Sequence, residues 1–317
     1  MKRSVITALI LALLLSSTVF SVPETLIPGG QTVGIELFTD GLLVTGVIPG
    51  SPAEAAGLRE NDRLLLADAN RLTSVQQLQQ LCQTGEPVVL SVDRDGLQAE
   101  FLLLPEKTEN GYRLGLYLRD HIAGIGTVTY YDPESDTFGA LGHGVSDPAG
   151  GELLPVSAGI LVPSAVIDVV KGKPGFPGIL RGSFDPTVVV GTISKNSEHG
   201  IFGSLTQQPE LPPIPVAGSG EIRTGSAQIL SNISGTAVAL YSVRIDKLSP
   251  DAKNGRNILL TVTDETLLSQ TGGIIQGMSG SPILQNGKIV GAVTHVLVNR
   301  PEVGYGIFIE NMLDEAD

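Results

Sequence analysis

The chain has 317 residues and a formal net charge of −13, with 42% hydrophobic residues, only 4% aromatic residues and no Trp. This acidic balance argues against a nucleic-acid partner, because a phosphate backbone would be repelled. The single cysteine, Cys82, excludes an internal disulfide and a cysteine-based metal site, and no cofactor motif is visible, so we expect neither a metal nor a cofactor.

The first residues have the pattern of an export signal. Lys2 and Arg3 precede the apolar run 5–15, and the residues around Ser21 are small enough for a cleavage site. We expect residues 1–21 to be a signal peptide or, since the apolar stretch is nearly long enough to span a bilayer, an uncleaved anchor that contacts the membrane. In both cases the rest of the chain would be exported and would act outside the cytoplasm.

The next segment, residues 29–105, is predicted to be one small domain. Residues 47–58 and 61–64 (VIPGSPAEAAGL and NDRL) resemble bacterial PDZ domains. A PDZ domain binds an extended peptide by adding it as a strand to an open sheet edge. We expect the segment after Gly29-Gly30 to offer backbone N–H groups to the C-terminal carboxylate of a peptide. The residues of this predicted loop are Thr32, Val33, Gly34 and Ile35, and a hairpin turn is predicted to follow at Asp40-Gly41.

Residues 112–317 form the second predicted domain. Short segments rich in Val and Ile recur between clusters of Gly, Pro, Asn and Asp, a pattern typical of a β-barrel or β-sandwich. Helix is indicated only at residues 163–168 and 310–315. The sequence therefore predicts a mainly β protein.

One glycine-rich segment, residues 277–282 (GMSGSP), has the features of a nucleophile loop for acyl transfer. Glycines allow a tight turn in which two backbone N–H groups point at one spot, where the negative charge of the oxyanion develops. We expect Ser279 to be the nucleophile and the N–H groups of Gly277 and Ser279 to form the oxyanion hole. The pattern resembles the corresponding loop of chymotrypsin-like peptidases.

A serine nucleophile needs a base and a group that orients the base. Among the four histidines, His143 lies between Gly142 and Gly144 in an open corner and is the preferred base. His295 lies in a predicted strand and is the second choice. Four acids near predicted strand ends could orient the imidazole, and the residues alone leave the choice open: Asp168, Asp185, Asp246 and Asp264.

The two domains together resemble the stage IV sporulation protein B family of endospore-forming bacteria. The matching stretches are residues 115–120, 123–126, 131–133, 139–143, 271–282, 291–295 and 304–306. The resemblance implies a PDZ domain followed by a chymotrypsin-like double β-barrel. It also implies that Ser279, His143 and Asp264 are the catalytic serine, histidine and aspartate.

The resemblance further implies a role in sporulation signalling. Such a peptidase would cut a membrane-anchored regulator of an intramembrane protease, and also itself, in the space between the forespore and mother-cell membranes. The cut would trigger processing of a pro-sigma factor. Two other functions remain open at this point: a general extracytoplasmic quality-control PDZ peptidase, and a non-catalytic PDZ scaffold.

Overall fold

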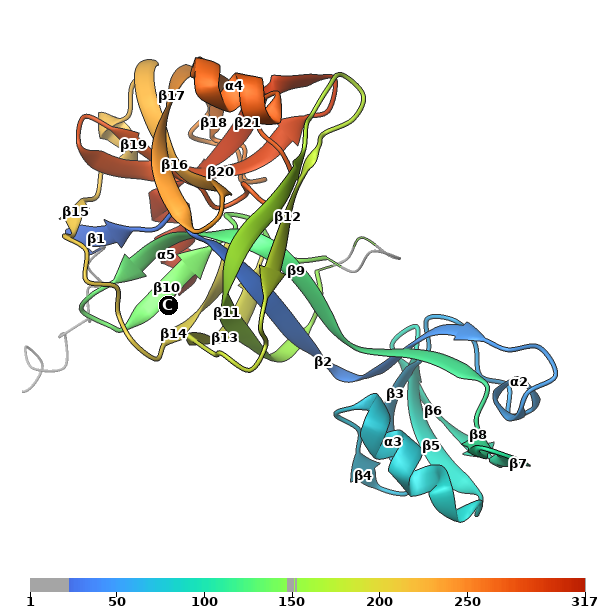
Figure 1. The fold of residues 1–317 in the computed structure, drawn as a ribbon. Coiled ribbons are helices and arrows are strands. Elements are labelled where there is room, and N and C mark those ends of the chain that lie inside the picture. Colours follow the sequence, from blue (N-terminus) through green and yellow to red (C-terminus); the bar gives the residue numbers. More distant parts are fainter. Residues whose placement is uncertain (1–22, 147–150, 152, 317) are drawn as a thin grey trace, which may run out of the picture.

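The computed structural model describes residues 23–146, 151 and 153–316. The predicted leader at residues 1–21 lies outside them. Strands dominate the described chain, which confirms the predicted mainly β class (Figure 1). None of the described helices is long and apolar enough to cross a membrane.

Two closed six-stranded antiparallel barrels lie side by side and form the larger part of the molecule (Figure 1). The first barrel runs β9-β10-β14-β13-β11-β2 and closes where β2 pairs with β9. Its strands are β2 (Thr32–Val47), β9 (Leu116–Asp132), β10 (Thr137–Ala140), β11 (Val156–Val170), β13 (Gly191–Ser197) and β14 (Gly200–Leu205). Its centre is filled by branched and aromatic side chains such as Leu37, Val128, Phe138 and Leu161.

The second barrel is formed by the C-terminal third of the chain. Its strands are β16 (Gly225–Ser234), β17 (Ala237–Leu248), β18 (Ile258–Val262), β19 (Pro282–Gln285), β20 (Lys288–Leu297) and β21 (Arg300–Phe308). β18 illustrates why this sequence forms barrel strands, because Ile258, Leu260 and Val262 are buried while the residues between them are less so. Alternation with a period of two places one row of side chains inside the barrel. Two barrels of this kind confirm the chymotrypsin-like double barrel.

Smaller elements complete the two barrels. They are β1 (Thr25–Pro28), β12 (Ile179–Phe184), β15 (Ile214–Pro215), the 3-10 helix η2 (Ser219–Glu221), α4 (Glu265–Thr271) and α5 (Ile309–Ala316). The helix predicted at residues 310–315 is confirmed by α5, whereas the one predicted at residues 163–168 is wrong. That segment belongs to β11 and pairs with β12, because its β-branched residues suit a two-stranded ribbon.

A buried amide helps to hold the barrels together. Asn232, in the second barrel, is almost fully buried and donates to the hydroxyl of Thr32 in the first barrel and to the carbonyl of Gly235. A buried amide without partners would cost roughly 1–3 kcal/mol, so this contact favours one docked arrangement of the barrels.

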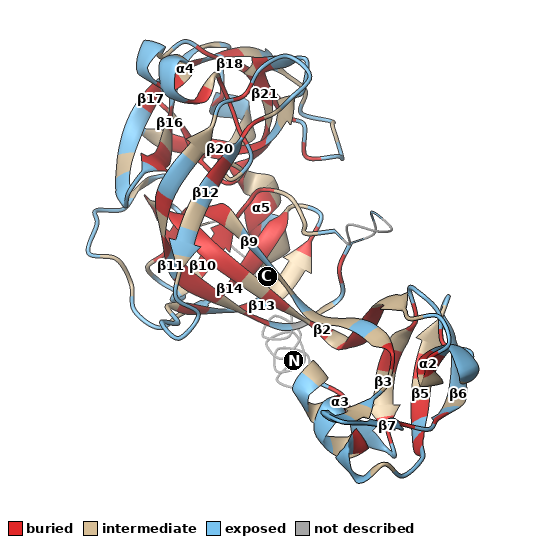
Figure 2. Cartoon of the chain, turned by 45° about the vertical axis from the view of Figure 1, so that its right-hand side comes forward, coloured by how far each residue is buried: buried red, intermediate tan, exposed pale blue. Residues whose placement is uncertain are grey.

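The PDZ domain stands apart from the barrels (Figure 1). It consists of α2 (Pro52–Ala55), β3 (Arg63–Ala67), β4 (Asn70–Arg71), α3 (Val75–Leu81), the 3-10 helix η1 (Cys82–Thr84), β5 (Val88–Arg94), β6 (Leu97–Leu103), β7 (Glu106–Thr108) and β8 (Gly111–Arg113), together with the distal parts of β2 and β9. Ser51 and Ser74 cap α2 and α3 by accepting backbone N–H groups. The domain has its own apolar core, visible as red strand faces in Figure 2.

Two long strands connect this domain to the first barrel. β2 and β9 pair with each other from Thr32 and Thr127 in the barrel to Val47 and Leu116 in the PDZ domain. The hairpin predicted at Asp40-Gly41 is wrong, because β2 continues through these residues as an irregularity in the pairing with β9.

The predicted start of the PDZ domain at Gly29 also differs from the structure. Residues 33–39 of β2 pair with β11, so they belong to the barrel sheet.

Candidate active site

The segment that carries Ser279 is a tight corner between the two barrels. Gly277 and Gly280 have φ angles of +99° and +98°, a region that favours glycine. A Cβ on Gly280 would stand 2.0 Å from the carbonyl oxygen of Thr127, so only glycine allows β9 to approach this closely. The N–H of Thr127 donates to the carbonyl of Ser279, and its hydroxyl donates to the carbonyl of Gly277. β9 therefore fixes the shape of the corner from the side of the first barrel.

Two N–H groups of this corner have no partner within the described part of the chain. Met278, Gly280 and Ser281 each donate their N–H to a backbone carbonyl, whereas Gly277 and Ser279 do not. The Met278 side chain between them is fully buried, which anchors the turn. The two predicted oxyanion-hole residues thus retain free donors on the loop of the predicted nucleophile.

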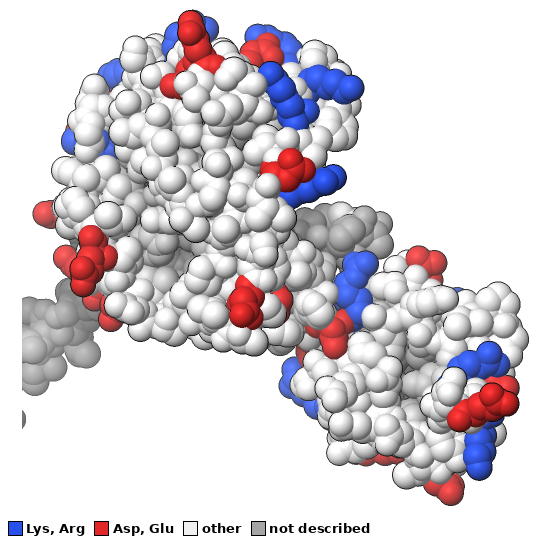
Figure 3. Space-filling view, in the orientation of Figure 1, with Lys and Arg blue, Asp and Glu red and all other residues white. Residues whose placement is uncertain are grey.

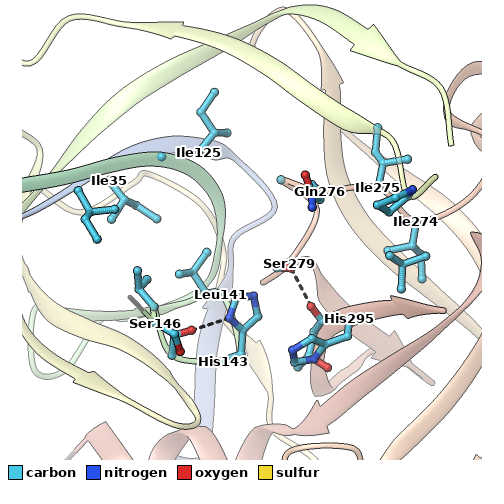
Figure 4. Close-up of a pocket in the computed structure, with 18 of the residues that line it drawn as sticks. Ile35, Ile125, Leu141, His143, Ser146, Ile274, Ile275, Gln276, Ser279 and His295 are labelled. Atoms are coloured by element: carbon cyan, nitrogen blue, oxygen red, sulfur yellow. Dashed lines mark hydrogen bonds between the residues drawn. The ribbon is translucent and has the colours of Figure 1, made fainter. Parts of the chain in front are cut away.

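The hydroxyl of Ser279 is directed at the second barrel. It donates to the carbonyl oxygen of Thr294 in β20 at 2.7 Å (Figure 4). Ser281, two residues on, is fully buried and its hydroxyl donates to that of Ser231. Of the two serines in the motif, only Ser279 reaches the cavity described below.

His143 follows β10 and enters the same space from the first barrel (Figure 4). Leu141 and Gly142 precede it with φ angles of +70° and +69°, which turn the chain out of the strand. Its Nδ1 lies 2.9 Å from the carbonyl oxygen of Gly144. Because a carbonyl can only accept, Nδ1 carries the hydrogen and Nε2 carries the lone pair. Burial lowers the pKa of His143 below its ordinary value of 6.5, so the imidazole is a neutral base at neutral pH.

A second imidazole stands beside the first. The ring centroids of His143 and His295 are 5.0 Å apart. Partial burial, then the neighbouring His143 and Arg256, lower the pKa of His295 to about 4. Both rings are therefore neutral near pH 7. His295, the second choice as base, lies next to the first choice, and its ring forms no hydrogen bond with a described residue.

The Ser279 corner, His143 and His295 all line one cavity of about 510 Å³ between the barrels. Most of its wall is apolar. The first barrel contributes Ile35, Leu37, Ile122, Ile125 and Leu141, and the second contributes Ile274, Ile275, Val296 and Val298. Such a cavity, with a few polar groups at one point, suits an apolar side chain next to a reacting carbonyl.

Comparison with known proteins assigns both parts of the chain. The family model SpoIVB peptidase S55 matches residues 110–313, and a PDZ domain model matches residues 43–94. The chain belongs to the SpoIVB peptidase S55 family. Residues 110–313 are its peptidase part, and the PDZ domain precedes them in the chain.

Other similar proteins share less with this S55 peptidase. The active form of the Rv3671c protease from M. tuberculosis is 18% identical with a TM-score of 0.35, over 62% of this chain and 74% of that one. The HtrA-type protease AlgW, solved with a decapeptide, is 12% identical with a TM-score of 0.35, over 66% and 54%. A protein of Brucella suis biovar 1 that carries the name zinc metalloprotease is 29% identical over 88 residues, which are 27% of this chain. The matched part spans only 23% of that relative.

The acid implied by the resemblance, Asp264, does not reach the cavity. It is the N-cap of α4, where its carboxylate accepts the N–H of Leu267 and the N–H of Ser242. A carboxylate is stabilised by such a helix N-terminus, which gives Asp264 a structural role. The other three candidates, Asp168, Asp185 and Asp246, bind polar groups elsewhere, and no described Asp or Glu lines the cavity. The site of this S55 peptidase thus brings together a serine and a histidine, with a backbone carbonyl at Nδ1.

The predicted carboxylate loop of the PDZ domain is also wrong. Thr32, Val33, Gly34 and Ile35 are buried in β2. They are paired with β9, and Val33 to Ile35 are paired with β11 on the other side as well. Backbone groups held in two ladders cannot bind a peptide.

The open sheet edge of the PDZ domain lies on β9 instead. Between Leu116 and Arg119, β9 pairs with β2 on one side only. Helix α3 runs beside the other side: the N–H of Val75 at its start donates to Asp120, and Gly85 just beyond its end lies against Tyr112. An open sheet edge of this kind is where a PDZ domain adds a peptide strand. The sequence signal for it is the apolar-Gly-apolar triplet at residues 114–116, which leads into the edge.

The described residues offer no metal site in this S55 peptidase. No group of three or more His, Cys, Asp and Glu side chains among them is arranged to hold an ion. Cys82 is buried at the end of α3, and burial raises the pKa of its thiol to about 11. Figure 3 shows Lys and Arg residues scattered among acidic ones on the visible face, without a continuous basic patch.

Proposed function

We propose that Ser279 is the nucleophile and His143 the general base of this endopeptidase. The observation that supports this most strongly is the pair of unpartnered N–H groups at Gly277 and Ser279, on the corner that carries the hydroxyl. These donors suit the oxyanion of a tetrahedral intermediate, and His143 lines the same cavity.

The proposed reaction begins with a rotation of the Ser279 side chain. The hydroxyl leaves the carbonyl of Thr294, transfers its proton to Nε2 of His143, and its oxygen bonds to the peptide carbonyl carbon. The C–N bond then breaks as the imidazolium gives the proton to the leaving amine. Water, deprotonated by the same nitrogen, hydrolyses the acyl-enzyme and restores Ser279.

The carbonyl of Gly144 has the orienting role in this scheme. Its bond to Nδ1 keeps the lone pair on Nε2, the nitrogen that must accept the proton. A neutral carbonyl stabilises the imidazolium less than a carboxylate would. We therefore propose a serine–histidine dyad rather than the triad that the resemblance implies.

The finer function that we propose is sporulation signalling outside the cytoplasm. Membership of the SpoIVB family supports cleavage of a membrane-anchored regulator of an intramembrane protease, and self-cleavage near the N-terminus. The basic and apolar start of the sequence supports export, with the leader removed or kept as an anchor. The PDZ edge on β9 supports recognition of the C-terminus of the substrate.

The test compares two serines of the same corner. Ser279→Ala should abolish labelling by a fluorophosphonate and lower cleavage of an unfolded casein substrate by about a thousandfold or more. Ser281→Ala is the matched control, because it removes a buried hydroxyl that does not reach the cavity, and it should still be labelled. Labelling of Ser279→Ala at the wild-type rate would contradict the assignment.

A further inference from the structure

One strand of the molecule extends from the open edge of the PDZ domain to the proposed nucleophile. β9 begins at Leu116, beside α3, and reaches Thr127, whose N–H donates to the carbonyl of Ser279 (Figure 1). Between Leu116 and Gly126 it pairs with β2 and with no other described strand. One edge of β9 is therefore unpaired over this whole stretch.

Hydrogen bonds at the PDZ end show which groups face the open edge. Successive residues of an antiparallel strand point their N–H and C=O alternately toward and away from the partner strand. The N–H of Ile48, just after β2, donates to the carbonyl of Gly115. The backbone groups of Leu116 and Leu118 consequently point away from β2, toward α3.

The same reasoning applies at the catalytic end. The N–H of Val128 donates to the carbonyl of Gln31, so Thr127 faces away from β2, as its bond to Ser279 also shows. Ala123 and Ile125 have the same orientation as Thr127, so their N–H and C=O groups point to the open edge, where they bind no described residue.

The alternation of the N–H and C=O directions along β9 shifts by one residue between the two ends, at the irregular pairing near Asp120. The carbonyl of Asp120 accepts from the hydroxyl of Thr39 in β2.

The open edge is also sterically accessible. Ala123 and Gly124 are exposed, and no atom lies within 4 Å of the point where a Cβ on Gly124 would stand. Ile122, Gly124 and Ile125 line the cavity that contains Ser279. The edge therefore leads into the active site and is open at Gly124.

We propose that a substrate binds as one added β-strand along the open edge of β9, with its C-terminal carboxylate at the PDZ end and its scissile bond at Ser279. This inference rests on the proposed roles of Ser279 and of the open PDZ edge of β9. The carboxylate accepts from the N–H of Gly115, which has no described partner, and from that of Leu116. The substrate then runs antiparallel to β9, from Leu116 toward Thr127.

This arrangement sets the distance between the cleaved bond and the C-terminus of the substrate. An added strand advances residue for residue with its neighbour, at about 3.3 Å each. The stretch from Leu116 to Thr127 therefore places the scissile bond about ten to twelve residues before the C-terminus of the substrate. The peptidase would trim tails at a set distance from their ends, in addition to any preference for the side chain in the apolar cavity.

The test varies the distance between a cut site and a free C-terminus. Mass spectrometry of a casein digest supplies one cleaved sequence, which is placed in peptides with Gly-Ser tails of about 4, 8, 11, 14 and 20 residues. The full-length enzyme should show the highest kcat/KM near 11 residues, about tenfold or more above the shortest and longest tails. Amidation of the C-terminus should remove this maximum.

A pair of substitutions at one position tests the strand itself. Ala123→Pro removes an N–H that faces the open edge and donates nothing to β2, a place where proline is tolerated. With Ala123→Pro, kcat/KM should become nearly independent of tail length. With Ala123→Ser, which keeps the N–H, kcat/KM should still have its maximum.

The outcomes separate this inference from the function on which it rests. Cleavage at rates that do not depend on tail length, or that fall slowly without a maximum, would overturn the proposed substrate binding along β9. The proposed role of Ser279 would not be affected. Absence of both cleavage and fluorophosphonate labelling in the wild-type enzyme would instead refute the proposed role of Ser279.

Discussion

At the scale of single residues, the chemistry depends on a histidine that stays neutral. In the proposed reaction His143 must be unprotonated to accept the proton of Ser279, and burial lowers its pKa below 6.5. The neighbouring His295, with a pKa of about 4, adds no positive charge above mildly acidic pH. The two rings therefore keep the base competent under conditions in which an exposed histidine would be partly charged.

This predicts an acid-shifted pH profile. A lowered pKa extends the neutral form of His143 to lower pH, so the acidic limb of kcat/KM should have its midpoint below 6.5. The measurement is kcat/KM against pH for a short peptide, with far-UV circular dichroism at each pH to show that the enzyme is folded. A midpoint at or above 6.5 would contradict the assignment of His143 as a buried base.

The capping role of Asp264 leads to a different prediction. Asp264→Ala should lower the free energy of unfolding by about 1 kcal/mol, because the N–H groups at the start of α4 lose their acceptor. Asp264→Ser should restore most of this stability, since serine also caps helices. Both variants should keep kcat/KM within about tenfold of the wild type, because a catalytic acid would cost far more.

A combined measurement of urea unfolding and peptide hydrolysis checks both effects. A folded Asp264→Ser enzyme that has lost activity a thousandfold would show that this carboxylate takes part in catalysis after all.

At the scale of elements, β9 shapes the catalytic corner through Thr127. This fully buried residue donates from its N–H to Ser279 and from its hydroxyl, at 2.8 Å, to Gly277. Thr127→Val keeps the shape of the side chain but leaves the Gly277 carbonyl without that donor. We expect kcat to fall by about tenfold with little change in KM, because the oxyanion donors of the corner lose their fixed orientation.

Thr127→Ser is the control for this prediction, because it retains the hydroxyl. The measurement is steady-state kinetics beside thermal unfolding of both variants. A Thr127→Val enzyme with wild-type kcat would show that the corner holds its shape without this bond.

The sequence predicts local corners well and strand partners poorly. The loops of Ser279 and His143 are recognisable in the sequence because the glycines beside them form tight turns. The segment at residues 32–35 was assigned to the wrong domain, because its apolar pattern fits a strand of either sheet and only tertiary pairing decides between them. The full length of β9 is not evident from the sequence, since Arg119, Asp120 and His121 interrupt its apolar pattern where it crosses between domains.

The Asp264 assignment shows a limit of another kind. The resemblance implies this assignment, whereas the local pattern of Asp264, Glu265 and Leu267 is that of a helix start. An orienting acid must be placed by tertiary structure, and among the described residues none is near enough to line the cavity.

At the scale of the whole molecule, the PDZ domain is an insertion between two neighbouring barrel strands. The family models divide the chain at about residues 94 and 110, yet the strands that join the parts belong to both. Recognition and catalysis are consequently joined by a two-stranded ribbon rather than by a flexible linker. A ligand on the PDZ edge of β9 lies on the same strand that holds the Ser279 corner.

This insertion also affects how the chain can reach its native state. Thr32 and Thr127 pair although about 95 residues separate them, and closing so long a loop in an unfolded chain carries an entropic cost. Once the inserted domain has folded, Val47 and Leu116 are already neighbours, and the two strands can zip from that end as a hairpin does. We expect the small domain to act as a template for the closure of the first barrel, so that defects in its core delay the formation of an enzyme whose reactive groups lie far from them.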